Sequence, residues 1–240
     1  MRYSIQRKEY SPGEILLKAW KHWTGSISSI LLIILIVYVP LNIVVALVPF
    51  EPFFAGIGLS FVGKILAWLS RSIDRIIGIV ATMAIIYLVS QRESRARVSI
   101  SDCLKRSLKR WPHMIATSLI YSVFLIGLFI LLIVPGIVYA VYWFFIIHVV
   151  ILKGKWGLDA LRYSRQIIKG RWWTVLGYVL VFAVLSFLAQ AVLAVPFLFS
   201  ENIIVMIAGD TISDFVASFF VVVGTVFFLN FDRTMVTATA

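Results

Sequence analysis

Cysteine, histidine and the signatures of soluble enzymes are scarce in this chain of 240 residues. Cys103 is the single cysteine, which excludes an intramolecular disulfide. His22, His113 and His148 are the three histidines, and they stand too far apart to form a metal-ligand motif. The chain has no Walker loop, no G-x-S-x-G elbow and no H-E-x-x-H helix. We therefore expect no metal, no cofactor and no enzymatic activity.

Charged residues are also few, at 14% against about 25% in an ordinary soluble domain, whereas 61% of the residues are hydrophobic. The apolar residues form blocks of about 20, the length a helix needs to cross a hydrocarbon layer of about 30 Å. We predict one all-α integral membrane domain over residues 1–240. Its expected spans are 25–48, 74–91, 113–134, 137–152, 174–197 and 213–231. The second, fourth and sixth have short apolar runs, so we expect them either to extend into their less apolar flanks or to lie where the bilayer is thinner.

Basic residues are unevenly distributed between the two sides that six spans define. The side with both termini and two loops carries 19 Lys and Arg against 6 acidic residues, and the other side carries 3 against 5. The positive-inside rule places the basic side in the cytoplasm. We predict a multi-pass protein of the plasma (inner) membrane with both termini cytoplasmic. Positive charge held at a membrane face favours anionic lipid, rather than nucleic acid, as its partner.

Three cytoplasmic segments resemble one another: "SPGEILLKAWKHW" from Ser11, "SISDCLKRSLKRW" from Ser99 and "GLDALRYSRQIIKGRWW" from Gly157. Each is an amphipathic helical pattern that ends in tryptophan. The first two begin with S-x-x-[DE], the pattern of a helix-capping box. The third departs from it, with Trp156 at the expected cap position.

A span that leads to a Val-Pro pair follows each of these segments. The pairs are Val48-Pro49, Val134-Pro135 and Val195-Pro196. Proline disfavours helix in the residue before it, so each pair is expected to end an outward span. We interpret the chain as three repeated units, each a cytoplasmic amphipathic helix plus a transmembrane hairpin. The units cover about 11–91, 99–152 and 157–231.

The cytoplasmic helices are predicted to have one apolar and one basic face. In 157–173 a helical period places Leu161, Ser164, Ile168 and Trp172 opposite Arg162, Arg165, Gln166 and Lys169. In 101–111 it places Leu104, Leu108 and Trp111 opposite Lys105, Arg106, Lys109 and Arg110. Two interpretations stay open: the helices set topology and pack against the spans, or they bind anionic lipid or an acidic partner protein. The candidate headgroup or interfacial residues are Lys18, Lys21, Trp23, Lys105, Arg106, Lys109, Arg110, Trp111, Arg162, Arg165, Lys169, Arg171 and Trp172.

Polar residues within the spans are a second group of candidates, because an ionisable group at membrane depth is costly. The group is Asn42, Asp74, His148, Gln190, Asp210 and Asp214. We expect the aspartates at the outer ends of their spans, with an ion or proton path as the alternative. Asn42 and Gln190 are expected to bond between helices. A neutral, hydrogen-bonded His148 is expected rather than a proton relay.

The segment "VPGIVYAVYWFFIIHVVILKGKWGLDALRYSRQIIKGRWW", from Val134 to Trp173, resembles the membrane domain fused to some glycerophosphoryl diester phosphodiesterases and its stand-alone relatives. The resemblance rests on the P-G-I motif from Pro135, the aromatic run Tyr142 to Phe145, and the pattern around Ala160, Ser164 and Lys169 to Trp172. His148 and Lys153 depart from the family pattern. The resemblance implies a six-span helical domain and no phosphodiesterase activity, because the soluble catalytic domain is missing.

These observations favour a non-enzymatic membrane scaffold or envelope-maintenance component. The alternatives are a transporter or permease for a lipid-like or small solute, and a membrane subunit of a larger complex. A polar cavity through the interior would favour transport. A close-packed interior with an accessible basic face would favour the scaffold.

Overall fold

A computed structural model describes residues 9–47, 56, 60–197 and 202–239, and every regular element in these ranges is helical. The elements are α1 (Pro12–Thr24), α2 (Ile27–Leu47), α4 (Ser60–Glu93), α5 (Ile100–Leu131), α6 (Ile133–Tyr142), α7 (Ile146–His148), η1 (Val149–Lys153), α8 (Leu158–Ile168), α9 (Trp172–Ala194), η2 (Val195–Phe197) and α10 (Ile203–Thr239). Within the described residues, six helical segments are long and apolar enough to cross a membrane. The predicted all-α fold with six spans is confirmed.

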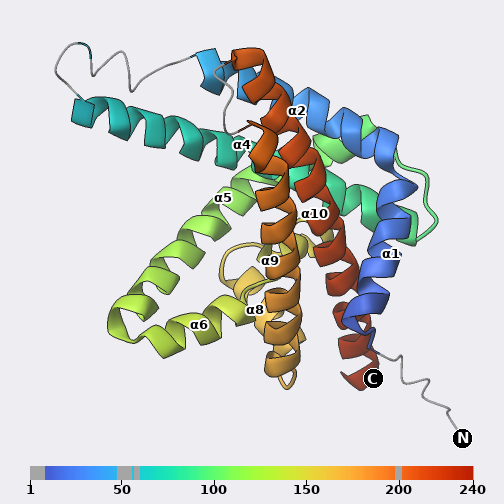
Figure 1. Cartoon of the computed structure of the whole chain (residues 1–240). Helices are drawn as coiled ribbons and strands as arrows, with labels where there is room; N and C mark the ends of the chain where they lie inside the picture. The colour runs from blue at the N-terminus through green and yellow to red at the C-terminus, as the bar shows by residue number, and fades with distance from the viewer. Residues whose placement is uncertain (1–8, 48–55, 57–59, 198–201, 240) are drawn as a thin grey trace, which may run out of the picture.

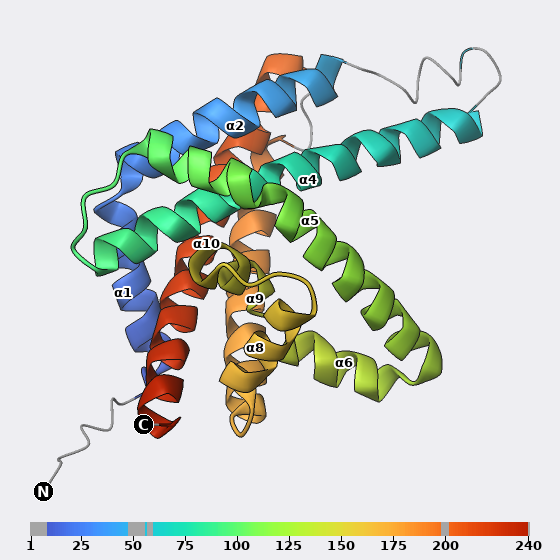
Figure 2. The same cartoon turned by 180° about the vertical axis from the view of Figure 1, so that it is seen from behind.

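Helix α10 lies at the centre of the fold and packs against α1, α2, α4 and α9 (Figure 1). In both views α2 and α4 run across the direction of α9 and α10 (Figures 1 and 2). The core lies where these helices meet: Met83 and Ile86 of α4, and Phe227 and Phe231 of α10, are fully buried. Long α4 and α10, of 34 and 37 residues, extend beyond the predicted spans, as expected for short apolar runs.

Helices α5 and α6 form a splayed hairpin that projects away from α10 (Figure 2). The hairpin turns at Leu132, whose extended backbone (φ −159°, ψ 130°) separates the two helices. The predicted end at Val134-Pro135 is therefore two residues late. Pro135 lies in the first turn of α6, where the backbone N–H that proline lacks has no partner within the helix. Gly136 packs so closely under the Phe129 ring that a Cβ would clash with it.

One junction differs from the three-unit pattern. The segment 99–111 forms no separate helix, because α5 continues through Pro112 into the span, whereas α1 and α2 are separated at Gly25 and Ser26. Helix α9 ends at Ala194, directly before the Val195-Pro196 pair, as predicted. The Val48-Pro49 pair lies outside the described residues. The repeat of three units stays a prediction.

The predicted fourth span is not one continuous helix. Helix α6 has 10 residues, about 15 Å of rise, and it is followed by a break, the short α7 and the π-helical η1. Polar backbone groups at membrane depth need partners within the protein. The Ser164 hydroxyl of α8 supplies them: it donates to the Tyr142 carbonyl (2.8 Å) and accepts from the Phe145 N–H (3.2 Å). The break is therefore stabilised by a side chain from the next helix.

Candidate functional site

Helix α8 has a buried apolar face and an exposed cationic face. Leu161, Ser164 and Ile168 are 4%, 0% and 0% exposed. On the other side Arg162, Arg165, Gln166 and Lys169 are exposed. The predicted division of this helix is confirmed, and the apolar face contacts protein. The helix starts after Gly157, whose φ of +59° favours glycine, so the cap residue is Gly157 rather than the expected Trp156.

Three hydrogen bonds hold α8 and the turn before it against their neighbours, besides those of Ser164. The Gly157 N–H donates to the Thr117 hydroxyl of α5 (2.9 Å). The Arg110 guanidinium donates to the Gly154 carbonyl (3.0 Å), and the positive φ of Gly154 (+71°) ends η1 there. On the far side, the Tyr163 hydroxyl donates to Asp232 of α10 (2.8 Å). The cationic face of α8 is thus presented by a helix fixed to α5 and α10.

A pocket of about 140 Å³ lies between α5, α6 and α8. Its lining residues are Phe124, Tyr139, Trp143, Leu158, Leu161, Arg162 and Arg165. The aromatic wall is built by mutual packing, because the Trp143 ring lies 5.0 Å from the Tyr139 ring and 6.3 Å from the Phe124 ring, centroid to centroid. The pocket has apolar walls on the hairpin side and two cations on the α8 side. Such a combination suits an anionic amphiphile.

The two pocket arginines are weakly engaged in the described contacts. Arg162 pairs with Asp159 at 3.4 Å, but both side chains are more than 70% exposed, so the pair contributes little. The Arg165 guanidinium lies 5.7 Å from the ring centroids of both Tyr139 and Tyr142, which are cation–π contacts. Guanidinium groups in this state can bind a phosphate through paired N–H donors.

A polar cluster near the C-terminal end of α10, which sequence analysis missed, joins five elements of the fold. We call the cluster Asn230, Asp232, Arg233 and Thr234 the α10 polar end. Asp232 is 6% exposed and binds Lys153 of η1 (2.6 Å) and Tyr163 of α8. Burial and, less strongly, the Asp232 carboxylate raise the pKa of Tyr163, so its hydroxyl stays a donor. Arg233 binds Glu93 of α4 (2.9 Å), which also contacts His22 of α1 (2.8 Å).

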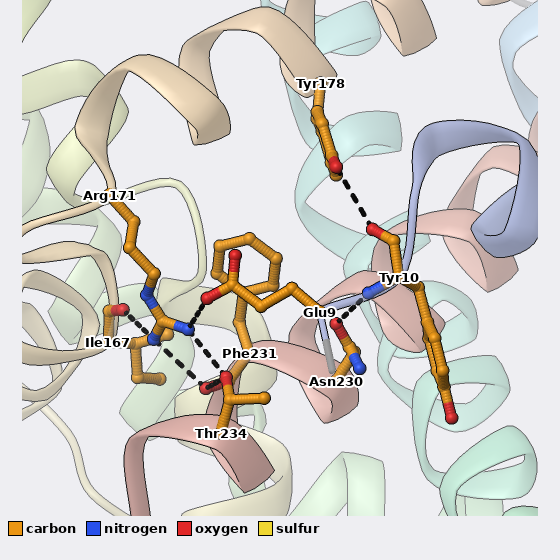
Figure 3. Close-up of polar contacts among 8 residues, drawn as sticks. All are labelled: Glu9, Tyr10, Ile167, Arg171, Tyr178, Asn230, Phe231 and Thr234. Carbon is orange, nitrogen blue, oxygen red and sulfur yellow. Dashed lines mark hydrogen bonds and ion pairs between the residues drawn. The ribbon is translucent and has the colours of Figure 1, made fainter. Parts of the chain in front are cut away.

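Arg171 belongs to the same cluster rather than to a lipid-facing surface (Figure 3). Its guanidinium contacts Glu9 (2.5 Å), the Thr234 hydroxyl (2.6 Å) and the Ile167 carbonyl (2.6 Å). Asn230 accepts from the Tyr10 N–H (3.1 Å) in the same view. The predicted headgroup role of Arg171 is wrong, because its donors are used inside the protein. The one sequence signal was the run Asn-Phe-Asp-Arg-Thr at 230–234, which crosses from the predicted span 213–231 into the C-terminal segment.

The three tryptophans predicted to lie at the lipid interface also tie helices together. The indole N–H of Trp23 donates to the Ser218 hydroxyl of α10 (2.9 Å). Trp111 donates to the Ile76 carbonyl of α4 (2.9 Å), and Trp172 to the Val138 carbonyl of α6 (3.1 Å). In each case the polar atom of the ring is bonded to a neighbouring helix, and the interfacial position of these tryptophans stays a prediction.

The predicted faces of α5 differ from the observed ones. Cys103 and Ser107 are fully buried, whereas Leu108 of the predicted apolar face is 55% exposed. The face of α5 that packs against protein, with Cys103 and Ser107, thus differs from the apolar face that the sequence predicted. In α1 the two residues at the matching register positions, Ile15 and Ala19, are likewise fully buried.

The remaining cationic candidates divide into engaged and exposed side chains. The Lys18 ammonium lies 3.5 Å from the centroid of the Tyr10 ring, and the Arg106 guanidinium lies 4.6 Å from that of Tyr87. Arg110 is engaged with Gly154, as described above. The exposed ones are Lys21, Lys105, Lys109, Arg162, Arg165 and Lys169. Only Arg162 and Arg165 among these line the pocket.

Two polar residues of the spans bond between helices as predicted. The Asn42 amide donates to Asp214 (3.3 Å), which links α2 to α10. The Gln190 amide donates to the Ser213 carbonyl (3.2 Å), which links α9 to α10. Asp210 is exposed on α10, and Asp74 lies in α4 with its side chain outside the described part.

His148 differs from the prediction. It is 5% exposed and stacks on Phe228 at 5.3 Å between ring centroids, and neither ring nitrogen has a hydrogen-bond partner among the described residues. A hydrogen-bonded histidine was therefore the wrong expectation. The ring lies beside Gly224, where a Cβ would make an ordinary van der Waals contact with it at 3.5 Å.

Residues 95–240 match a family described as a domain of unknown function, DUF7847. The chain belongs to this family. The DUF7847 region starts between α4 and α5 and includes every residue of the pocket and of the α10 polar end, whereas α1, α2 and α4 precede it. Neither the curated proteins nor the solved structures contain a match to the chain. The match therefore places the chain in an uncharacterised family, and the likeness to phosphodiesterase membrane domains stays a resemblance.

Proposed function

We propose that this protein is a non-enzymatic membrane scaffold that associates with anionic lipid through the exposed face of α8. The observation that carries the proposal is the separation of the two faces of this helix. Leu161, Ser164 and Ile168 are buried in the protein, so Arg162 and Arg165 are held outward. Each basic residue near an anionic bilayer contributes about 1 kcal/mol of attraction. A fixed row of cations at a membrane surface is a suitable anchor for acidic phospholipid.

The proposal includes an orientation in the plasma (inner) membrane, with the basic loops and both termini on the cytoplasmic side. The charge bias between the two sides supports it. In this orientation α8 faces the cytoplasmic leaflet, where anionic lipids produce a negative surface potential. Reporter fusions to each terminus check this part, and an external reporter signal from the C-terminus would contradict it.

The alternative proposal, a transporter, has one observation in its favour. Discontinuous helices often line transport sites, and the break after α6 lies near His148, which is buried without a described partner. Against it, the backbone groups beside the break are bonded to Ser164 rather than open to a solute. The 140 Å³ pocket lies beside the cationic face of α8, and the pocket at Tyr10, His22 and Asn230 measures about 10 Å³, room for about one water. We therefore favour lipid association.

The test measures lipid composition around the purified protein. The protein is equilibrated in mixed micelles of phosphatidylglycerol and phosphatidylcholine, and the retained lipid is extracted and quantified. We expect the retained lipid to be several-fold richer in phosphatidylglycerol than the micelles, with the enrichment reduced by 0.5 M salt because exposed charges are screened.

A matched pair of variants locates the effect. Arg162→Gln/Arg165→Gln removes two cations from α8, and Lys105→Gln/Lys109→Gln removes two exposed cations from α5. The first pair should abolish most of the enrichment, and the second should reduce it only slightly. Equal enrichment by wild type and by the α8 variant would contradict the proposal. Equal losses in both variants would show that a diffuse basic surface, rather than the α8 face, attracts the anionic lipid.

A further inference from the structure

We propose that the pocket between α5, α6 and α8 binds one phospholipid, with its phosphate on Arg162 and Arg165 and its glycerol and upper acyl chain against Phe124, Tyr139 and Trp143. The inference rests on the proposed function and deepens it: the α8 surface holds a specific lipid in addition to attracting anionic lipid in general.

The cationic side of the pocket suits a phosphate. Arg162 and Arg165 are three residues apart on α8, so they lie on neighbouring positions of one helix face. Each guanidinium presents paired N–H donors that match phosphate oxygens. Asp159 is the acid near them, and its 3.4 Å contact with Arg162 is between exposed side chains. A phosphate that meets two guanidinium groups can displace such a weak pair.

The opposite side of the pocket suits the apolar part of a lipid. Five of the seven lining residues are aromatic or aliphatic. Trp143 is 8% exposed and keeps one side of the wall in place, whereas Phe124 and Leu158 are about half exposed at the rim. A free inorganic phosphate would leave these apolar surfaces uncovered, so a lipid accounts for more of the lining.

The surface next to the pocket continues the apolar wall. On α5, Phe124 lies thirteen residues after Trp111, which is about 20 Å along the helix axis towards the hairpin tip. Its neighbours Val123 and Ile126 are 71% and 59% exposed, as lipid-facing side chains are. An acyl chain that leaves the pocket along α5 therefore meets apolar surface. With about 140 Å³, the pocket holds a headgroup rather than a single water, which needs only about 10–15 Å³.

The experiment uses native mass spectrometry of the whole protein, released from detergent after delipidation and titration with phosphatidylglycerol. We expect one lipid to bind to each chain with saturation, before weaker binding of further lipids. Arg162→Gln/Arg165→Gln should weaken this first binding at least 10-fold. Leu158→Trp should weaken it similarly by filling the pocket while every cation remains. Leu119→Trp, at a 64% exposed position of α5 outside the pocket lining, is the matched control and should bind like wild type.

The outcomes separate this inference from the proposed function. If Leu158→Trp binds the first lipid as wild type does, the pocket inference fails, even where the anionic enrichment in micelles remains. If wild type shows no anionic enrichment at all, the proposed function itself fails. Soluble glycerol phosphate is the competitor: effective displacement of the lipid by it would show a phosphate site without lipid recognition and would overturn the assignment. Gel filtration of each variant, with an unchanged elution volume, establishes that it is folded.

Discussion

Helix α10 and the α5–α6 hairpin are both strongly apolar, yet they have opposite surroundings. In the apolar stretch of α10, 39% of the residues are buried inside the protein, against 11% in that of α5. Phe227 of α10 is fully buried, whereas Ile130 of α5 is 80% exposed. The α10 polar end bonds to η1, α8 and α4, and the hairpin tip around Leu132 is apolar throughout. Hydropathy alone thus identifies a span without telling whether its neighbours are protein or lipid.

The difference has a physical origin in side-chain packing. In a membrane, lipid tails are as apolar as leucine, so helices associate through close packing and hydrogen bonds rather than through the hydrophobic effect. Phe227 packs against several rings, among them Phe145 at 5.1 Å and Phe231 at 4.7 Å between centroids. The hairpin contacts α2, α4, η1, α8 and α9, while its tip residues stay exposed, such as Ile130 at 80% and Leu131 at 76%. The comparison predicts where substitutions are costly.

The largest effect is expected from Phe227→Ala. This change removes a ring from a filled core and leaves a cavity, which should lower the free energy of unfolding by about 3 kcal/mol. Ile130→Ala at the hairpin tip should change it by less than about 0.5 kcal/mol, because its surroundings are lipid or detergent. The measurement is equilibrium unfolding in mild detergent. A loss of unfolding free energy at Ile130 as large as that at Phe227 would mean that the tip is covered by protein. It would contradict the contrast between the hairpin and α10.

A smaller loss is expected from Asp232→Ala. This substitution leaves Lys153 and Tyr163 without their shared acceptor, and we expect a loss of about 2 kcal/mol, below the range for fully buried pairs because Lys153 is one-third exposed. Asp159→Ala is the matched control, because it breaks an exposed ion pair on α8 and should cost less than about 0.5 kcal/mol. Thermal unfolding of both variants in the same detergent compares them. Equal midpoints would contradict a structural role for the α10 polar end.

The smallest effect has the opposite sign. His148→Leu replaces a buried polar ring that lacks a described hydrogen-bond partner with an apolar side chain of similar size, and it should stabilise the protein by about 1 kcal/mol. Loss of the stacking on Phe228 offsets part of the gain. The shift of the thermal unfolding midpoint measures the net change in stability.

Ser164→Ala is the counterpart of this variant, since it removes a buried polar group that has both of its partners. It should lower stability by about 2 kcal/mol, because two backbone groups beside the break lose their hydrogen bonds. A destabilised His148→Leu variant would indicate that the ring nitrogens are satisfied in solution, for example by water, and would remove the contrast between the two residues.

Sequence patterns predicted the elements better than the contacts. The capping box at the start of α1 is present as expected, with Ser11 and Glu14 bonded reciprocally. The second start differs, because Ser99 accepts from the Ser101 N–H rather than from that of Asp102. The faces of α8 followed from the helical period, whereas those of α5 did not, because Cys103 and Ser107 carry no strong apolar signal and yet form its packing face.

The candidate site was predicted in part. Arg162 and Arg165 were identified as exposed cations on the correct face, but the aromatic wall contributed by Phe124, Tyr139 and Trp143 was not. These rings belong to spans, where aromatic residues are common, so their type and spacing carried no signal. Their convergence depends on the angle between α5 and α6, which opens at Leu132.

By itself, the sequence determined the number of apolar segments, the helical class, the bias of charge and the two faces of α8. These properties depend on composition and on a period of 3.6 residues, which are local. The tertiary structure alone decided which spans face protein, how Ser164 completes the broken fourth span, and why Arg171 points inward while Arg162 and Arg165 stay exposed. Such outcomes depend on partners as distant in the chain as Glu9 and Arg171, and only helix packing brings them within hydrogen-bond distance.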